Sequence, residues 1–260
     1  MEPEILFSRS ELNGVAWAEV TLNRPDKGNA LNMSMLEQLA SIVGEIASER
    51  SLRAVVIRGR GRFFCTGGDI EAWSALAPRD MGQDWVLRGI EVFDRLAALP
   101  QPVIAALSGH ALGGGLELAL AADLRIAVRS AKLGTPEVTL GMIAGWMGVR
   151  RLAEIVGVAR ARHMTLLGAP ITAEQALNWG LITALAEDAA DMEKQLGGWL
   201  ERLCANGPAA MALTKGILKT LHQDLRHQHA CAVEQAAGTE DCKEGVRAFR
   251  EKRKPIFRNR

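Results

Sequence analysis

The sequence predicts an α/β protein whose helices cover a sheet, followed by a C-terminal third that is almost entirely helical. Short apolar segments rich in Val and Ile alternate with amphipathic helical segments as far as about residue 145. Beyond that point the strand pattern nearly vanishes. These two observations predict a sheet-containing core that precedes a helical C-terminal region.

The first elements are expected to be a hairpin and a helix. Two alternating segments within residues 4–22 flank Asn13 and Gly14, a dipeptide that favours a tight hairpin turn. Residues 34–50 repeat apolar side chains with a 3.6-residue period, and three glutamates lie outside that stripe. This pattern is typical of an amphipathic helix.

Two further strands are expected at residues 53–58 and 103–107, because both are short, apolar and bounded by Gly- or Pro-containing segments. A helical stretch at 81–98 separates them. The C-terminal third is expected to form helices at 147–167, 172–180, 189–205, 208–222 and 226–250, with one short apolar run at 181–186. No fixed-period repeat is visible.

Composition and charge exclude several classes of protein. The chain has 260 residues, 48% of them hydrophobic, and 31 basic against 30 acidic residues, which is too balanced for coating nucleic acid or an anionic membrane. Four widely spaced cysteines form neither a metal pair nor a disulfide framework, and are interpreted as reduced thiols.

His222, His227 and His229 lie in a charged stretch and are interpreted as a solvated helix face, so no metal is expected. Without a signal peptide or an apolar run of about 18 residues, a cytoplasmic location is expected.

Two glycine-rich turns are the first candidates for chemistry. Residues 63–70 contain Gly67 and Gly68 and follow the strand at 53–58, whereas Gly113, Gly114 and Gly115 open a helix after the strand at 103–107. Glycines at the start of a helix let the backbone approach a ligand, and the unpaired N–H groups there attract negative charge. Neither turn matches GxxxxGK[ST] or GxGxxG, which disfavours nucleotide binding.

Two glutamates accompany these turns. Glu117 lies in the first turn of the helix that the glycines open, and Glu137 follows Pro136 in a loop. Taken singly, Glu117 could serve only a charge–dipole contact and Glu137 could be a solvated loop residue. Their combination with the two turns is what indicates a site.

The whole set resembles the enoyl-CoA hydratase/isomerase, or crotonase, superfamily. The matching segments run in the family's order over nearly the entire chain: Leu22-Asn23-Arg24-Pro25 with Asn29-Ala30-Leu31-Asn32, Phe64 with Gly67, Asp69 and Ile70, residues 102–106 leading through Gly113-Gly114-Gly115 and Glu117-Leu118 to Asp123, Pro136-Glu137 with Gly141, and residues 244–257. The resemblance implies a spiral of β-β-α units with a helical C-terminal oligomerisation region. It divides the chain into a core at 1–195 and a helical region at 196–260 that makes trimer contacts.

The resemblance also implies catalytic roles. The backbone N–H groups of Gly68 and Gly114 match the two that hold the thioester oxygen, and donors placed where charge develops are worth about 3–4 kcal/mol each. Glu117 would activate the water that adds to C3, while Glu137 would share that water and give a proton to C2. The helix start should favour the ionised form of Glu117, and a nearby carboxylate should oppose double ionisation. Family isomerases commonly lack one of the pair, so its presence favours hydration.

The substrate implied is an acyl-CoA thioester, with coenzyme A as part of the substrate and no separate cofactor. Lys27 and Lys252 are the candidates for contacting coenzyme A, although Lys252 could equally belong to a solvated basic tail. The other substrate-binding candidates are Gly67, Asp69, Gly145 and Trp146. Trp146 departs from the family, where many hydratases read Pro-Gly-Ala-Gly-Gly; it could wall the acyl site or be a buried core residue.

Other functions stay open at this stage. An enoyl-CoA isomerase is one alternative, and a decarboxylase of short branched malonyl-type acyl-CoA is another, because some such relatives carry a Trp near this point. One branch of the family binds RNA through lysines on its first long helix, but here the helix at 34–50 has only Arg50 as a basic residue. A non-catalytic CoA-ester binder should have lost a glutamate or a glycine turn, and neither is lost. The implied assembly is a homotrimer or a dimer of trimers, with neither nucleic acid nor a membrane as partner.

Overall fold

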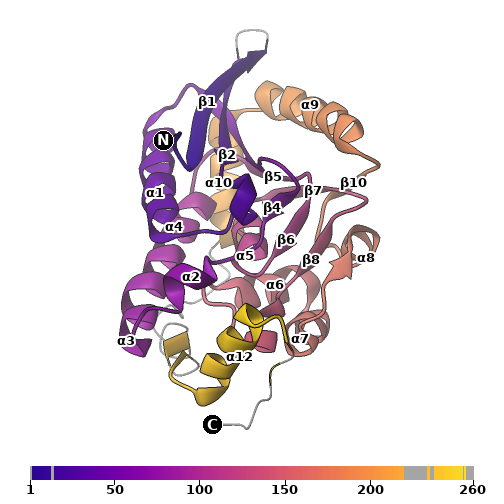
Figure 1. Ribbon diagram of the computed structural model, residues 1–260. Coiled ribbons are helices and arrows are strands. Elements are labelled where there is room, and N and C mark those ends of the chain that lie inside the picture. Colours follow the sequence, from indigo (N-terminus) through magenta and orange to yellow (C-terminus); the bar gives the residue numbers. More distant parts are fainter. Residues whose placement is uncertain (1, 13–14, 220–232, 235–236, 254, 256–260) are drawn as a thin grey trace.

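The computed structural model describes residues 2–12, 15–219, 233–234, 237–253 and 255 (Figure 1). It confirms the α/β class: two sheets lie at the centre, and helices surround them. The turn at Asn13 and Gly14, the histidine cluster at 222–229 and Cys231 lie outside the described residues. No helix among the described residues is both long and apolar enough to cross a membrane.

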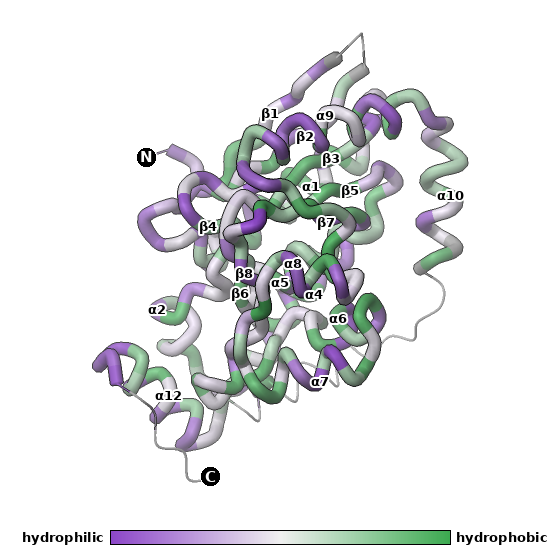
Figure 2. Tube along the Cα trace, turned by 90° about the vertical axis from the view of Figure 1, so that its right-hand side faces the viewer, coloured by the Kyte–Doolittle hydropathy of each residue, from purple (hydrophilic) through white to green (hydrophobic). Residues whose placement is uncertain are grey.

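The larger sheet has six strands. Its hairpin pairs antiparallel, as predicted, and the next four strands join it in parallel. The strand order is β1 (Ile5–Leu12), β2 (Val15–Leu22), β3 (Leu52–Gly59), β5 (Val103–Leu107), β7 (Leu124–Val128) and β10 (Ala184–Ala186). Every residue of β5 is buried, which explains its unbroken apolar sequence. Figure 2 shows the apolar colour concentrated along β3, β5 and β7 in the interior.

The smaller sheet has four very short strands. They are β4 (Phe63–Cys65), β6 (His110–Leu112), β8 (Lys132–Gly134) and β9 (Ile171–Thr172), in that order. Three times, a strand of the larger sheet is followed by a strand of the smaller one and then by helix: β3–β4, β5–β6 and β7–β8. This is the expected spiral of β-β-α units. The inserted helices differ in length, so the units leave no fixed period in the sequence.

The helices of the first half follow the predicted ranges closely. Helix α1 (Met33–Ser48) begins where the side chain of Asn32 accepts a hydrogen bond from the N–H of Met35 at 2.8 Å. The stretch predicted at 81–98 is interrupted: a π-helical turn, η2 (Met81–Val86), precedes α4 (Leu87–Ala97). The remaining short helices are η1 (Pro25–Lys27), α2 (Ile70–Trp73), α3 (Pro78–Asp80), α5 (Gly114–Leu120) and η3 (Pro136–Leu140).

The C-terminal third is helical, with two corrections. The helix predicted at 226–250 is broken at residues 238–239, where Thr239 is extended and caps α12 (Glu240–Arg250). The single helix predicted at 147–167 is two helices, because Gly157 adopts φ +81° and ends the first of them. The helices are α6 (Gly148–Val156), α7 (Val158–Leu167), α8 (Ala173–Asn178), α9 (Ala189–Ala205), α10 (Pro208–Lys219) and α12 (Glu240–Arg250). The boundary expected at residue 195 lies inside α9, and the division into two regions stays a prediction. Helix α12 packs against η3 and lies at the end of the molecule opposite the hairpin (Figure 1).

Candidate active site

The first glycine turn lies between β4 and α2. Leu31 bridges it from both sides: its N–H donates to the carbonyl of Gly67 at 2.8 Å, and its carbonyl accepts from the N–H of Asp69 at 2.7 Å. Gly67 has φ +112°, a conformation that favours glycine. The carboxylate of Asp69 caps α2 by accepting from the N–H of Glu71 at 3.1 Å. These bonds hold Gly67 and Asp69, the neighbours of Gly68 on either side, and so fix the position of the Gly68 N–H.

The Asn-Arg-Pro and Asn-Ala-Leu-Asn segments brace this turn. Asn29 is fully buried, and its side chain accepts from the N–H of Arg24 at 2.9 Å and donates to the carbonyl of Phe63 at 2.8 Å. Arg24 in turn donates to the carbonyl of Ala30 at 2.6 Å and to the carboxylate of Asp69 at 3.0 Å. These motif residues therefore form the scaffold of the turn, and the carboxylate of Asp69 points to that scaffold.

The second glycine turn lies between β6 and α5. Gly113 has φ +54° and donates to the carbonyl of Gly134 at 2.9 Å, and Gly114 is the first residue of α5. A Cβ at Gly115 would overlap the backbone carbonyl of Cys65. Each of the three glycines is therefore required, one by conformation and the others by the close approach of neighbouring groups.

The two turns bring two backbone N–H groups together. A Cβ built on Gly114 would lie 3.3 Å from the nitrogen of Gly68, and one built on Gly67 would lie 3.2 Å from the nitrogen of Gly114. Within the described part of the chain, neither Gly68 nor Gly114 donates its N–H to a protein acceptor. Gly114 is buried and Gly68 is half-buried, and an N–H group shielded from solvent without a protein partner is unusual, so this pair is available for an oxygen of a ligand.

Glu117 is held rigidly beside this pair. The residue is 2% exposed, and its Oε1 accepts hydrogen bonds from the N–H groups of Trp146 and Gly148, both at 2.7 Å. Burial raises the pKa of Glu117 to about 7, against the lowering effect of these two bonds and of the nearby Arg151 charge. The helix start is expected to favour the ionised form of Glu117, but desolvation acts in the opposite direction and sets the direction of the shift.

Glu137 is placed differently. It lies in η3, and both of its carboxylate oxygens are buried without a hydrogen-bond partner in the described structure, although the residue as a whole is half-buried. A Cβ on Gly113 would lie 3.1 Å from its Oε1, so the carboxylate faces the second glycine turn. Burial, followed by the charge of Glu117, raises the pKa of Glu137 to about 8. An unpartnered buried carboxylate is costly and marks a group ready to bind water or substrate.

The turns and both glutamates line one small cavity of about 100 Å³. Gly67, Gly68, Gly114, Gly145 and Trp146 all lie on its wall, so the structure brings most of the predicted site residues together. Trp73 and Trp85, which sequence reasoning did not single out, complete the aromatic part of that wall. The lining also includes apolar side chains from three further segments: Met81, Val86, Leu140, Met142, Ile143 and Val233.

The two candidate coenzyme A contacts do not line the cavity. Lys27 lies on the surface, and its Nζ pairs with the carboxylate of Glu71 at 3.0 Å. Lys252 follows α12 with φ +53° and is exposed. The structure therefore leaves their role as a prediction.

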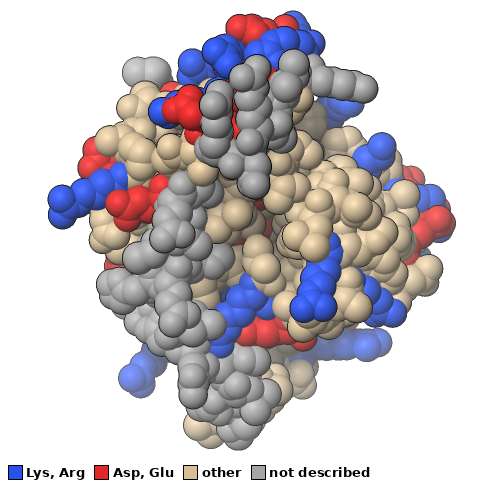
Figure 3. Space-filling model, turned by 90° about the horizontal axis from the view of Figure 1, so that it is seen from below, with Lys and Arg blue, Asp and Glu red and all other residues tan. Residues whose placement is uncertain are grey.

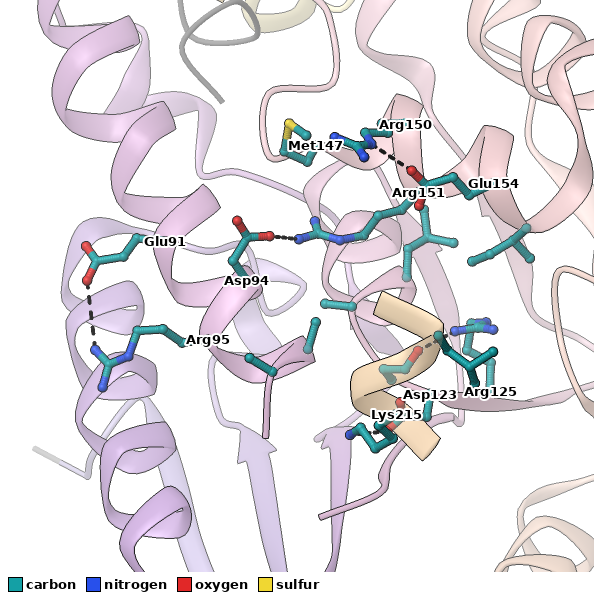
Figure 4. Close-up of a pocket in the computed structure, with 17 residues that line it drawn as sticks. Glu91, Asp94, Arg95, Asp123, Arg125, Met147, Arg150, Arg151, Glu154 and Lys215 are labelled. Carbon is teal, nitrogen blue, oxygen red and sulfur yellow. Dashed lines mark hydrogen bonds and ion pairs between the residues drawn. The ribbon is translucent and has the colours of Figure 1, made fainter. Parts of the chain in front are cut away.

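A larger cavity of about 700 Å³ is lined by residues of α4, α5, α6 and α10, and sequence reasoning missed it. Figure 4 shows Arg151 reaching from α6 to Asp94 of α4; the two groups lie 2.5 Å apart. Another nitrogen of the Arg151 guanidinium donates to the carbonyl of Trp146 at 2.8 Å. Arg151 thus holds the loop whose N–H groups bind Glu117. No sequence signal marks this pair, because Asp94 and Arg151 are 57 residues apart.

Comparison with known proteins shows the family of the chain. Residues 12–260 match the family model described as Enoyl-CoA hydratase/isomerase. Among curated relatives, the Short-chain-enoyl-CoA hydratase of Clostridium acetobutylicum is 37% identical over 94% of this chain and 95% of its own. The 2,3-dehydroadipyl-CoA hydratase of Escherichia coli is 36% identical over 93% of this chain and 94% of its own.

A solved structure, carnitinyl-CoA hydratase from Mycobacterium avium, superposes with a TM-score of 0.83 and 32% identity, covering 100% of both chains. The match to the family model covers far more than half of the chain, and the fold agrees with it. The chain therefore belongs to the enoyl-CoA hydratase/isomerase family and is an enzyme of the crotonase superfamily.

Proposed function

We propose that the protein adds water to 2-enoyl-CoA to give 3-hydroxyacyl-CoA, or catalyses the reverse reaction. One observation supports this above all: two N–H groups without an acceptor among the described residues and two buried carboxyl groups line the same cavity. A thioester enolate needs the first pair, and transfer of protons to and from water needs the second. The substrate is a CoA thioester, as for the enzymes of this family.

In this proposal the N–H groups of Gly68 and Gly114 bind the thioester oxygen. Addition of water at C3 places negative charge on that oxygen, so donors already in position stabilise the transition state more than the substrate. The donors are held by the Leu31 bridge and by the start of α5, and need no rearrangement during the reaction. Loss of one such donor costs about 3–4 kcal/mol.

The two glutamates share the proton transfers. With a pKa of about 7 for Glu117 and about 8 for Glu137, Glu137 is mostly protonated at neutral pH while a large share of Glu117 is ionised. Ionised Glu117 takes a proton from the water whose oxygen bonds to C3, and protonated Glu137 gives a proton to C2. The net change is the addition of one water: Glu117 has gained one proton and Glu137 has lost one, and transfer of a proton from Glu117 to Glu137 restores the starting state.

The mass of the product distinguishes a hydratase from an isomerase and from a decarboxylase. In H2¹⁸O, a hydratase converts 2-butenoyl-CoA into a product heavier by one H2¹⁸O, as measured by mass spectrometry. An isomerase gives no change of mass with 3-enoyl-CoA, and a decarboxylase removes CO2 from a methylmalonyl-type thioester. Absence of ¹⁸O incorporation by folded protein would overturn the proposal.

Binding of RNA receives no support from the surface. Helix α1 carries Glu37 and Glu45 on its exposed side, and each of them pairs with an arginine. On the face shown in Figure 3, basic side chains are scattered among acidic ones over the described residues. A continuous basic track is what nucleic-acid binding needs.

We also propose that the protein is cytoplasmic and that Lys27 and Lys252 contact coenzyme A. We further propose that it assembles as a homotrimer or a dimer of trimers. Large exposed apolar side chains on the C-terminal helices support an assembly: Leu166 and Leu167 on α7, Leu213 and Leu218 on α10, and Phe249 on α12. Light scattering on a sizing column measures the mass directly. A monomer at micromolar concentration would contradict the proposal.

A further inference from the structure

The indole of Trp146 is fixed at the end of the candidate cavity. Its Nε1 donates to the carbonyl of Trp85 at 3.3 Å, and the two indoles lie 5.6 Å apart. Phe93 packs against it edge-on at 5.3 Å. Its own N–H is bonded to Glu117 and its carbonyl to Arg151, so both the backbone and the ring are held. The ring is therefore part of a rigid wall rather than a side chain that can turn away.

Two glycines make room for this ring. A Cβ at Gly89 of α4 would overlap its Nε1, and a Cβ at Gly114 of α5 would overlap its Cζ3. The far edge of the ring, Cη2, would lie 3.5 Å from a Cβ on Gly68. The indole thus fills the slot between α4 and α5 and touches both residues that carry the free N–H groups. When the thioester carbonyl is bound by the N–H groups of Gly68 and Gly114, the acyl carbons attached to it must therefore pass along the Trp146 ring.

The rest of the cavity leaves little room for a longer chain. Its volume of about 100 Å³ is small beside the roughly 300–1,000 Å³ of sites for drug-sized ligands. Trp73, Trp85 and Met81 line it on the side of α2 and η2. Among the described lining residues there is no Lys, Arg or His, so a carboxylate at the end of the acyl chain would meet no cationic partner among them.

We infer that the enzyme acts on short, uncharged acyl groups of about four to six carbons, and that Trp146 is the residue that sets this limit. The inference rests on the proposed hydration of 2-enoyl-CoA. It adds the substrate class, which neither the glutamate pair nor the N–H pair determines, because both act only on the carbons nearest the thioester.

The first test is the chain-length profile of the wild-type enzyme. We expect kcat/KM for 2-butenoyl-CoA to exceed that for 2-octenoyl-CoA by at least about tenfold, since one methylene that does not fit a pocket already lowers kcat/KM by about tenfold or more. We expect 2-hexenoyl-CoA to be preferred by a similar factor over its analogue with a terminal carboxylate. Equal rates for the short and long chains, or for the charged and uncharged chains, would overturn the inference while leaving hydration intact.

The second test replaces the ring. In Trp146→Leu the preference for the four-carbon chain should fall to about threefold or less, because the slot between α4 and α5 opens. Trp179→Leu is the matched control: this indole packs on His163 and Arg160, is not part of the cavity wall and should leave the profile unchanged. An unchanged profile in folded Trp146→Leu would contradict the role of the ring.

A binding measurement separates failure of this inference from failure of the proposed function. Calorimetry with the saturated thioesters butyryl-CoA and octanoyl-CoA needs no hydration, and butyryl-CoA should bind at least about tenfold more tightly. Tighter binding of butyryl-CoA without hydration of any enoyl-CoA would support the size limit and refute the hydratase. Equal binding of both thioesters would refute the size limit, even if Trp146→Leu failed to fold.

Discussion

Replacement of Glu137 by Gln should stabilise the folded protein at alkaline pH, even though it should abolish activity. Both carboxylate oxygens are buried without hydrogen-bond partners in the described structure, and the Glu117 carboxyl shares the cavity. Glutamine keeps the shape of the side chain but carries no charge. An active-site group that lowers stability in return for function is a known pattern in enzymes.

The structure gives a ceiling for the effect. The pKa of Glu137 is about 8 in the folded protein, against an ordinary value of 4.5. One pKa unit corresponds to about 1.4 kcal/mol, so ionisation of Glu137 costs the folded state at most about 5 kcal/mol. Because the folded pKa is raised, this cost is absent below about pH 4.5, grows as the pH rises from about 4.5 to about 8, and is constant at its full value above about pH 8. Entry of water lowers the cost, and we expect about 1–3 kcal/mol at pH 9.

The assay is urea unfolding followed by tryptophan fluorescence at pH 5, 7 and 9, at one protein concentration. The difference in unfolding free energy between Glu137→Gln and wild type should be near zero at pH 5 and grow with pH. Glu201→Gln, which changes an exposed carboxylate on α9, is the control and should show no such growth. A difference for Glu137→Gln that stays constant from pH 5 to pH 9 would refute the reasoning.

Three further predictions concern the surroundings of the site. Gly114→Ala should lower kcat/KM by at least about 100-fold, because its Cβ overlaps the Trp146 ring and crowds the N–H pair; normal kinetics would argue against that pair. Asn29→Ala should lower the free energy of unfolding by about 2–4 kcal/mol in urea, since it leaves buried backbone groups unpaired; a loss below about 0.5 kcal/mol would count against the scaffold role. Arg151→Gln should move the acidic limb of the pH–kcat/KM profile to higher pH, because the Arg151 charge lowers the pKa of Glu117; an unmoved limb would exclude this influence.

Much of the fold was predictable because its larger elements carry strong periodic signals. The hairpin, α1, β5 and α9 all lie where the apolar pattern placed them. The positions of the strands of the smaller sheet were not predicted, because β4, β6 and β8 have three residues each and leave no room for an alternating pattern. The break at Gly157 was missed for another reason: a glycine within an amphipathic stretch is compatible both with a continuous helix and with a helix end.

Some features of the candidate site could likewise be predicted from the sequence, and others could not. The glycine turns and the two glutamates were found because they belong to short motifs, and the structure places them around one cavity. The fit of the Trp146 ring between Gly89 and Gly114 was not predictable, since it depends on how α4 and α5 lie relative to each other. The raised pKa of Glu117 was likewise beyond the sequence, because the degree of burial decides it.

The most direct test of the central claim is the loss of ultraviolet absorbance of 2-butenoyl-CoA on adding the protein, with Glu137→Gln and Glu117→Gln measured beside the wild type. We predict rapid loss with wild type and a fall in kcat of at least about 100-fold in each folded variant, as is typical when a general acid or base is removed. No loss of absorbance with wild type, or undiminished turnover in either folded variant, would contradict hydration by this pair of carboxyl groups.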